Sequence, residues 1–400
     1  MCQFHDTRLP SGLPSLRAAP KLSLMITFGF KRRHFAPVLA CALLCLSIGL
    51  APAAANDDWP TIDPADAGFA PDVVTKLDAA VDAGELPNLH AVVVARGGKL
   101  VFERYYAGTD ERWGRPLGTV TFRPDIKHDL RSVSKSIVSL LYGIALGAGQ
   151  VPAVDQPLVD QFPAYPDLAQ DPTRRRITVA HTLSMMMGTE WNERLPYTDP
   201  RNSEIAMERA PDRYRFVLDR PMVDKPGSQW NYNGGATAVL ARIIADGSGT
   251  ALLPYARKML FRPLGITDTE WVAGLDGEPA AASGLRMRPR DLAKIGQLVL
   301  NRGRWDRQQI IPADWLDQSF TRRATVEDGL DYGYQWWLGR LRHDGEPWMA
   351  GFGNGGQRLF IAPSLDLVVV ITAGNYNRRE LRRVPIAVIG DHVLPALRDN

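Results

Sequence analysis

The stretch HDLRSVSKSIVSLLYGIAL, residues 128–146, predicts a buried helix that begins with polar side chains. Its apolar residues recur at near-helical spacing, at Ile137, Leu140, Leu141, Ile144 and Ala145. The first turn instead carries Ser132, Ser134, Lys135 and Ser136. Serine competes with helical backbone hydrogen bonding and lysine resists burial, so these residues add little to a helix that only packs. The first turn therefore indicates a chemical role.

The spacing of Ser132 and Lys135 places both side chains on one face of this helix, where they can touch. A serine at a helix start lies near unpaired N–H groups and the positive end of the helix dipole, which favour a developing anion. A partly desolvated lysine beside it can act as a neutral base or keep the serine oxygen deprotonated. About one Ser-x-x-Lys is expected by chance in a chain this long, so an exposed first turn without function is the alternative.

A second motif, DKPGSQWNYNGGATAVLARI at residues 224–243, places Tyr232 between a Pro-Gly turn and a helix. A phenol can join the lysine as a proton shuttle, taking the serine proton and passing it to the leaving group. The alternative is a tyrosine that packs in the core beside Trp230.

A third motif, AGFGNGGQRLF at residues 350–360, places glycines before a strand. Glycines let the backbone approach a ligand closely, and an N–H group here can supply half of an oxyanion hole, with the Ser132 N–H as the other half. A glycine turn that enters a hairpin is the alternative.

The two ends of the chain predict strands, and the middle predicts helices. Two β-rich runs at residues 89–108 are separated by Gly97 and Gly98, and a similar pair at residues 357–375 turns near Pro363. Between them, roughly within residues 132–300, apolar helical stretches alternate with proline and glycine. We therefore expect an α+β fold, with a mainly antiparallel sheet built from both chain ends, flanked by helices, and an inserted helical subdomain.

The first 55 residues predict a secretory signal. Residues 31–35 (KRRHF) are basic, an apolar run follows, and Ala53-Ala54-Ala55 places the cut before Asn56. Translation from Met25 and a twin-arginine route are alternatives. All three cysteines precede the cut, so residues 56–400 form a cysteine-free domain without disulfides or zinc-thiolate sites. We expect a periplasmic or secreted product with no stable membrane insertion.

The composition is that of an ordinary globular chain, with 45% hydrophobic and 23% charged residues. The net charge of +3 makes nucleic acid an unexpected partner. There is no G-x-S-x-G, H-E-x-x-H or P-loop motif, and His128 and the other histidines show no ligand spacing. The sequence therefore predicts no metal and no cofactor, and a small-molecule substrate as the partner.

The order Ser-x-x-Lys, then Tyr232, then a glycine-rich strand entry resembles the serine β-lactamase and penicillin-binding-protein-like hydrolase superfamily. The likeness is to its class C-like branch, with esterases, D-aminopeptidases and 6-aminohexanoate-dimer hydrolases. Further supporting stretches are TVAHTLSMMMG, SGLRMRPRDLAKIGQLVLNRGRW, YGYQWWLG and GNGGQRLFIAPSLDLVVVITAGNYN. The resemblance implies a β-lactamase-like fold, with Ser132 as the acylated nucleophile, Lys135 as its base partner and Tyr232 as the second proton shuttle.

Two departures from the family pattern bear on the substrate. The family motif is Tyr-x-Asn, but residue 234 is Gly, so the amide is missing unless Asn233 or Asn231 replaces it. The last motif normally starts with a cation, but here it reads Asn354-Gly355-Gly356-Gln357, unless Arg358 or Arg286 stands in.

These motifs predict an exported serine hydrolase that acts through an acyl-enzyme on small esters or linear amides. The residues expected to bind substrate or the oxyanion are Gln357, Gly356, Asn354 and Asn233. A β-lactamase or D-Ala-D-Ala peptidase is one alternative, and a non-catalytic penicillin-sensor-like module is another. Replacing Gly234 by Asn and Asn354 by Lys is expected to favour β-lactam acylation over ester cleavage.

Overall fold

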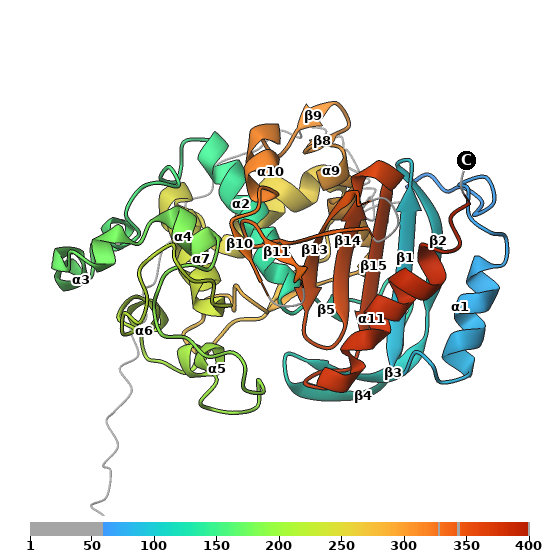
Figure 1. Ribbon diagram of the computed structural model, residues 1–400, viewed down its shortest axis with the longest axis horizontal. Coiled ribbons are helices and arrows are strands. Elements are labelled where there is room, and N and C mark those ends of the chain that lie inside the picture. The colour runs from blue at the N-terminus through green and yellow to red at the C-terminus, as the bar shows by residue number, and fades with distance from the viewer. Residues whose placement is uncertain (1–58, 327–328, 342–344, 399–400) are drawn as a thin grey trace, which may run out of the picture. The chain divides into compact units, whose positions relative to one another are not determined.

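The central sheet is built from both ends of the described chain. The computed structural model describes residues 59–326, 329–341 and 345–398, so the predicted signal region and the first three positions after the predicted cut lie outside the described residues. The sheet has eight strands in the order β10-β11-β12-β13-β14-β15-β1-β2 (Figure 1). Its bounds are β1 (Leu89–Arg96), β2 (Lys99–Tyr105), β10 (Ala324–Thr325), β11 (Asp331–Tyr332), β12 (Trp337–Arg340), β13 (Pro347–Gly353), β14 (Gln357–Ala362) and β15 (Leu367–Ala373).

The antiparallel pairing of β1 with β15, in which Val93 faces Val370, joins the two chain ends. Both predicted hairpins are present. Gly97 and Gly98 turn β1 into β2 with φ of 61° and 74°, and a short 3-10 turn, η6 (Pro363–Leu365), connects β14 to β15. The α+β prediction with a sheet from both ends is confirmed.

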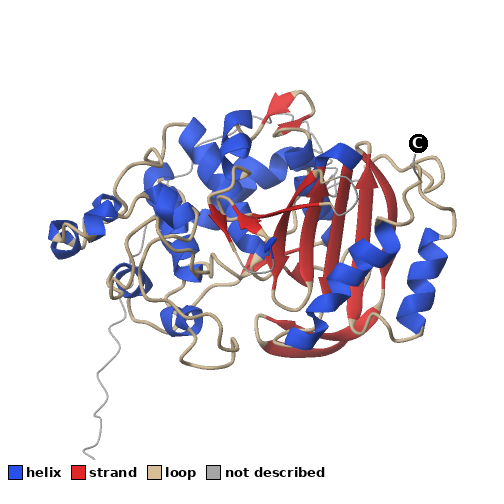
Figure 2. Ribbon diagram, in the orientation of Figure 1, coloured by secondary structure: helices blue, strands red, loops and turns tan. Residues whose placement is uncertain are grey.

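Helices cover both faces of this sheet (Figure 2), which explains its continuous apolar strands. Successive side chains point to opposite faces, so Val92 and Val94 pack in one apolar cluster while Val93 and Ala95 pack in the other. The covering elements are α1 (Val73–Asp82), α11 (Arg383–Ala387) and η8 (Val388–Val393) on the first face, and α9 (Pro289–Leu300) and α2 (Val133–Gly147) on the second.

Helix α2 is the core helix of the molecule. Every residue from Val133 to Ala145 is buried, as expected for a helix that is apolar around most of its circumference. It packs between helix α7 (Gly234–Ser248) and strand β13. Its N-terminus therefore lies where the sheet meets the helical part of the chain.

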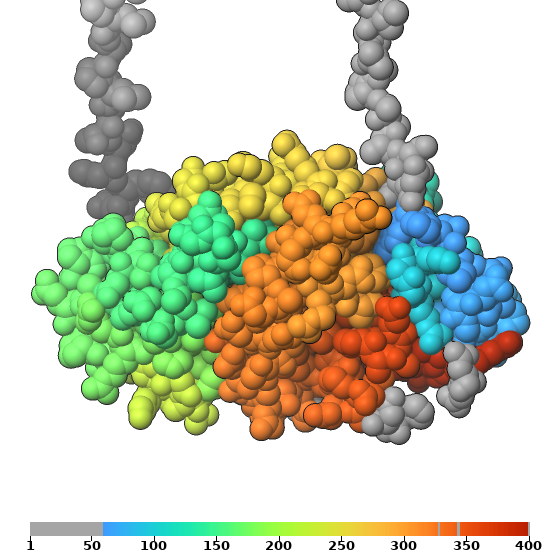
Figure 3. All heavy atoms as spheres, turned by 90° about the horizontal axis from the view of Figure 1, so that it is seen from above, coloured from blue at the N-terminus to red at the C-terminus, as the bar shows by residue number. Residues whose placement is uncertain are grey.

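The middle of the chain forms this helical part, seen as the green and yellow surface in Figure 3, with the blue and red chain ends on the opposite side. Its helices are α3 (Pro166–Gln170), α4 (Val179–Leu183), α5 (Ser203–Glu208), α6 (Arg213–Leu218), α7 (Gly234–Ser248) and α8 (Leu252–Ala256), with the short turns η1 (Val159–Gln161), η2 (Arg174–Arg176), η3 (Arg257–Phe261) and η4 (Arg262–Leu264). Short helix α10 (Ala313–Ser319) and turn η7 (Arg379–Arg382) complete the helices described.

Three small sheets accompany the central sheet in the described part of the chain. The strands are β3 (Ala107–Arg112) with β4 (Arg115–Thr121), β5 (His128–Asp129) with β7 (Leu285–Met287) and β6 (Glu270–Trp271), and β8 (Arg304–Trp305) with β9 (Gln308–Gln309). Within the described ranges, no single helix is long and apolar enough to cross a membrane. One pair bent by 73°, Gly234–Ser248 with Leu252–Leu264, passes on length and composition alone.

Candidate active site

Ser132 is the residue at which helix α2 begins. It is the N-cap of the helix, with φ of −68°, and it is 8% exposed. The preceding residue, Arg131, has φ of 49°, a left-handed conformation that is uncommon for a residue other than glycine. The Arg131 side chain is held by an ion pair with Glu111, and its guanidinium lies 4.5 Å from the centre of the Tyr376 ring. This anchoring fixes the backbone that presents Ser132.

Lys135 contacts Ser132 as the spacing predicts. Its ammonium Nζ lies 3.0 Å from Ser132 Oγ, 3.3 Å from Glu204 Oε2 and 3.1 Å from the Ala282 carbonyl oxygen. The side chain is 1% exposed. An ammonium group has three N–H donors, so these contacts use all of them.

The other two serines of the first turn have structural partners. Ser134 Oγ donates to the Arg131 carbonyl at 2.6 Å and accepts from the Leu285 N–H at 3.2 Å. Ser136 Oγ donates to the Gln335 carbonyl at 2.8 Å. Only Ser132 among the three faces Lys135, as the helical spacing predicts.

Tyr232 lies just before helix α7 and next to both residues. Lys135 Nζ is 5.0 Å from the centre of the Tyr232 ring, and Ser132 is among the groups that influence the pKa of the Tyr232 phenol. Burial raises the pKa of Tyr232, although the charge of Lys135 works in the opposite direction. The structure thus brings Ser132, Lys135 and Tyr232 together.

Asn233 and Asn231, the two candidates to replace the missing amide at position 234, both have hydrogen-bond partners within the protein. Asn233 is the N-cap of α7, where its Oδ1 accepts from the Ala236 N–H at 3.0 Å and its Nδ2 lies 4.0 Å from Met187 Sδ. Asn231 Nδ2 donates to the Trp191 carbonyl at 2.9 Å. Both side chains therefore have partners, and a substrate contact through Asn233 Oδ1 would break the cap of helix α7.

A carboxylate occupies the space beside Gly234. A Cβ atom at Gly234 would overlap Glu204 Oε2, and it would lie 2.9 Å from Glu204 Cδ and 3.0 Å from Glu193 Oε1. Glu204, on the short helix α5, is 2% exposed. The Tyr-x-Asn pattern would place an amide at position 234. Here the buried carboxylate of Glu204 lies beside that position and pairs with Lys135.

Glu193, which is half-buried, supplies a second carboxyl group at this site. It accepts from Trp191 Nε1 at 2.6 Å, from the Tyr197 hydroxyl at 2.9 Å and from the Gly234 N–H. Burial, followed by the neighbouring charge of Glu204, raises the pKa of Glu193 to about 7. Ionising both Glu193 and Glu204 would place two negative charges close together, which is unfavourable. The two carboxyl groups therefore share one proton near neutral pH.

The same carboxylates set the charge of Lys135. Burial alone would lower the pKa of Lys135, but the attraction of Glu204, Tyr232 and Glu193 outweighs it and raises the pKa. Lys135 conversely lowers the pKa of Glu204, against the effect of burial. The resting pair is an ammonium and a carboxylate. Of the two alternatives that the sequence left open for Lys135, the structure favours the cation over the neutral amine in the resting state.

Sequence reasoning missed Glu204 and Glu193. They lie 69 and 58 positions after Lys135 in a segment whose pattern shows neither a metal nor a catalytic spacing. The sequence did show that Gly234 leaves a gap, but the carboxylate that fills the gap comes from a different helix.

The residues of the third motif are bonded within the sheet. Gln357 Nε2 donates to the Ala373 carbonyl at 2.8 Å, and its Oε1 accepts from the Ala373 N–H at 3.1 Å. The Gly356 N–H bonds to the Gly353 carbonyl at 3.3 Å. The side chain of Asn354 exchanges hydrogen bonds with Asn377. Substrate contacts through the side chains of Gln357 and Asn354, or through the Gly356 N–H, would compete with these bonds, and the roles of all three residues stay predictions.

The backbone that approaches α2 comes from the end of β13 instead. A Cβ at Gly351 would lie 3.0 Å from Val133 Cγ1, and one at Gly353 would overlap the Leu130 carbonyl. Pairing between β12 and β13 ends at Ala350, so the edge beyond it has no β12 partner. Among the described residues, no backbone carbonyl accepts from the Ser132 N–H.

Tyr232 belongs to a row of three neighbouring aromatic side chains. Trp337 lies 5.9 Å from Tyr232 and stacks on Phe352 at 5.1 Å, between ring centres. The Arg358 guanidinium covers the outer face of Phe352 at 4.1 Å. Trp336, in contrast, is fully buried. We call Tyr232, Trp337 and Phe352 the aromatic wall.

The two arginines considered for a substrate carboxylate differ. Arg286 is 6% exposed and forms an ion pair with Asp129, so its charge is already neutralised in the core. Arg358 donates to the Gln357 carbonyl at 2.8 Å and lies by the aromatic wall. Only Arg358 of these two is near the candidate site.

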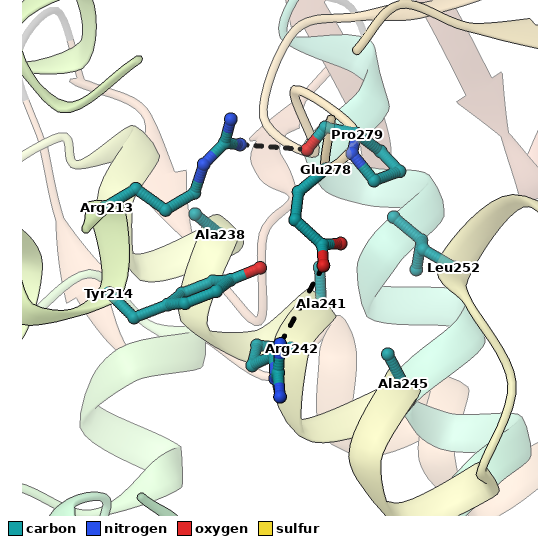
Figure 4. A pocket seen from close by; sticks show the side chains of 9 residues that line it. All are labelled: Arg213, Tyr214, Ala238, Ala241, Arg242, Ala245, Leu252, Glu278 and Pro279. Carbon is teal, nitrogen blue, oxygen red and sulfur yellow. Dashed lines mark hydrogen bonds and ion pairs between the residues drawn. The ribbon is translucent and has the colours of Figure 1, made fainter. Parts of the chain in front are cut away.

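Two hollows of the described chain differ in their distance from the candidate site. An open cleft of about 590 Å³ adjoins the aromatic wall through Trp230, whose ring centre is 6.1 Å from that of Tyr232. It is lined by Trp191, Asn192, Arg194, Asp224, Gln229, Trp230 and Asn231. The second hollow, of about 10 Å³, has room for about one water molecule and contains none of the predicted site residues (Figure 4).

Residues 76–389 match the model of the Beta-lactamase family. The chain belongs to the Beta-lactamase family. A relative from Paenarthrobacter ureafaciens, a 6-aminohexanoate-dimer hydrolase, is 26% identical over 329 residues, which cover 74% of this chain and 77% of that protein. Lovastatin esterase of Penicillium rubens is 26% identical over 141 residues, or 33% of each chain.

The fold of this Beta-lactamase family member also resembles solved structures. One is EstCE1, a hydrolase with promiscuous acyltransferase activity, which superposes with a TM-score of 0.63 at 16% identity, over 80% of this chain and 97% of that chain. At this identity the similarity shows the fold alone. With the family and the two relatives, it establishes a hydrolase of the serine β-lactamase-like type and confirms the predicted relationship.

Proposed function

We propose that this chain is an exported serine hydrolase that cleaves small esters or linear amides through an acyl-enzyme on Ser132. The observation that carries the proposal is the contact of 3.0 Å between Ser132 Oγ and Lys135 Nζ at the start of a buried helix. The relatives named as an amide hydrolase and an esterase support the substrate class.

The proposed reaction begins with proton movement inside the site. Glu204 Oε2, 3.3 Å from Lys135 Nζ, can accept a proton from the ammonium, and the neutral amine then takes the proton of Ser132. Ser132 Oγ bonds to the substrate carbonyl carbon, and the carbonyl π electrons move to its oxygen. When the tetrahedral intermediate collapses, the leaving alcohol or amine receives the proton through Tyr232 or Lys135. Water then cleaves the ester to Ser132 by the same route.

The oxyanion of this intermediate needs donors that are already in place. The Ser132 N–H at the helix start has no backbone acceptor among the described residues. We propose that the second donor is an N–H of the β13 edge, within residues 351–353, because that edge abuts α2 and is free of β12. This replaces Gly356, whose N–H is already bonded.

The aromatic wall supports small, weakly polar acyl groups as substrates. Trp337 offers apolar area beside Tyr232, and Phe352 extends that area. Glu204 adds negative charge at the position where an amide would grip an acylamino side chain, and residue 354 supplies no cation for a carboxylate. These features favour esters and linear amides over β-lactams and D-alanyl peptides.

Export remains part of the proposal. It rests on the basic and apolar pattern of residues 31–55 and the predicted cut before Asn56, with residues 56–400 as the hydrolase domain and a helical subdomain roughly within residues 132–300. Amino-terminal sequencing of protein recovered outside the cytoplasm is expected to begin at Asn56. An intact amino terminus on all recovered protein would refute the cut.

The test of function combines labelling with a substrate panel. A fluorophosphonate probe, read by mass spectrometry, is expected to label Ser132 and to leave Ser132→Ala unlabelled, while Ser228→Ala, at an exposed serine, labels like the wild type. Turnover of p-nitrophenyl butyrate or a 6-aminohexanoate dimer is expected to exceed that of nitrocefin and a D-alanyl peptide. Nitrocefin turnover far above the others would favour a β-lactamase, and a single burst without turnover would favour a penicillin-sensor-like module.

A further inference from the structure

A buried cluster of two histidines and one aspartate lies behind the start of helix α2. His90 on β1 and His128 on β5 are 0% exposed, and Asp110 on β3 is 6% exposed. One ligand atom from each residue lies within 4.8 Å of those of the other two. His90 Nδ1 is 2.9 Å from His128 Nε2, and His128 Nε2 is 3.6 Å from Asp110 Oδ1. Neither the proposed reaction nor the sequence motifs use this cluster.

The position of the proton on His128 follows from its outer partner. His128 Nδ1 lies 2.9 Å from the backbone carbonyl of Asp129, which can only accept a hydrogen bond. Nδ1 therefore carries hydrogen. In the neutral ring, His128 Nε2 is then a bare lone pair that faces His90.

The position of the proton on His90 follows from Asn88. The Asn88 amide is oriented by the backbone of Thr109, because Oδ1 accepts from the Thr109 N–H at 2.9 Å and Nδ2 donates to the Thr109 carbonyl at 3.0 Å. Asn88 Oδ1 lies 3.2 Å from His90 Nε2, so this nitrogen carries hydrogen. His90 Nδ1 is consequently the second bare lone pair.

Two lone pairs and a carboxylate oxygen thus converge on one buried point, an arrangement that repels itself unless a cation lies among them. We propose that His90, His128 and Asp110 bind a divalent transition-metal ion, with Zn²⁺ as the best match. Imidazole nitrogen and carboxylate oxygen are common zinc ligands. A metal-bound histidine normally donates its outer N–H to an oxygen, as both rings do here.

A shared proton is the competing occupant of this gap. A metal ion requires neutral rings, and its positive charge also neutralises Asp110. The hydrogen-bond partners of the outer ring nitrogens and the burial of both rings therefore favour a metal ion over a shared proton in this gap.

The role of this ion is structural. Asp110 also accepts a hydrogen bond from the Tyr376 hydroxyl at 2.8 Å. The Tyr376 ring in turn makes a cation–π contact with the guanidinium of Arg131, the residue before Ser132. The ion would therefore tie β1, β3 and β5 together and steady the turn that presents the nucleophile. It has no contact with the reacting atoms in this proposal.

The first test is the metal content of the full chain, purified without a histidine tag. Mass spectrometry of the elements is expected to find about one zinc per chain in the wild type and in His392→Gln, a matched histidine outside the cluster. His128→Asn and Asp110→Asn are expected to lose at least nine-tenths of it. Zinc that is absent from the wild type, or equal in all variants, would overturn the proposal.

Chelation of the wild type supplies a second readout that does not depend on folding of the variants. Removal of the metal is expected to lower Tm, and Zn²⁺ at about one hundred times its Kd is expected to restore about 3–5 °C. Co²⁺ in its place is expected to give visible absorption bands that His128→Asn lacks. No Tm change on chelation and no Co²⁺ spectrum would show that the gap holds a proton only, and the proposal would be wrong.

Discussion

Replacing Gly234 by alanine is the sharpest test of the carboxylate pair beside Lys135. Gly234 is the first residue of α7, where alanine normally stabilises a helix by up to about 1 kcal/mol. Here the new methyl group would overlap Glu204 Oε2 and lie 2.9 Å from Glu204 Cδ. The carboxylate must therefore move away from Lys135, and the change is expected to destabilise the protein.

The size of the effect follows from the buried ion pair. At the 3.3 Å separation of Lys135 and Glu204, two unit charges attract by about 5 kcal/mol at an effective dielectric of about 20. Breaking a buried pair typically costs about 3–5 kcal/mol. After the helix gain is subtracted, Gly234→Ala is expected to lose about 2–4 kcal/mol of unfolding free energy. Because Lys135 also positions Ser132, kcat/KM is expected to fall by at least about 100-fold.

The assay is urea unfolding together with p-nitrophenyl butyrate hydrolysis. Gly235→Ala is the matched control, since its methyl group meets Trp191 and Val217 rather than a carboxylate. It is expected to lower stability but to keep the wild-type pH profile of activity. In Glu204→Ala, adding Gly234→Ala is expected to cost little more, because the obstacle is gone. Wild-type activity in Gly234→Ala, or full additivity in the double variant, would refute the reasoning.

This packing also qualifies the expectation that asparagine at position 234 restores β-lactam acylation. Asparagine has the same Cβ as alanine, so it also displaces Glu204. We expect Gly234→Asn alone to lose activity on every substrate. Room for the amide arises only when Glu204 is shortened as well.

Three further outcomes are expected. The folded pKa of Glu193, about 7, exceeds its ordinary value of 4.5, so the stability that its proton contributes is present below pH 4.5 and lost as pH rises through 7. Glu193→Gln is therefore expected to lose less stability than the wild type between pH 5 and pH 8 in urea unfolding. Trp337→Ala is expected to cut the preference for p-nitrophenyl butyrate over the acetate up to roughly tenfold, because each buried methylene is worth about 0.8 kcal/mol; an unchanged ratio would remove Trp337 from the acyl site. Gln357→Ala leaves the buried N–H and carbonyl of Ala373 unpaired, at about 1–3 kcal/mol each, so Tm is expected to fall with KM unchanged. A large rise in KM with normal Tm would restore Gln357 as a substrate contact.

Much of the candidate site was predictable because it depends on local spacing. Ser132 and Lys135 are three residues apart on one helix, so helical geometry alone brings them together. Tyr232 lies about a hundred residues later, and only the resemblance to a known family placed it beside them. The glycine-rich motif was located correctly as a strand entry. The oxyanion or substrate role of Gln357 stays a prediction, and the bond of its side chain to Ala373 could not be read from the sequence.

The sequence by itself determined the two hairpins, the sheet from both chain ends, the buried helix and the Ser132–Lys135 contact. Each of these depends on periodicity or on a short separation along the chain. Only the tertiary structure decided the charge of Lys135 and which side chain occupies the space beside Gly234. Glu204 and Glu193 reach both residues from a different segment of the chain. The same holds for His90, Asp110 and His128, which come from three strands. Electrostatic energies depend on distance and burial, and neither quantity is defined until the chain has packed.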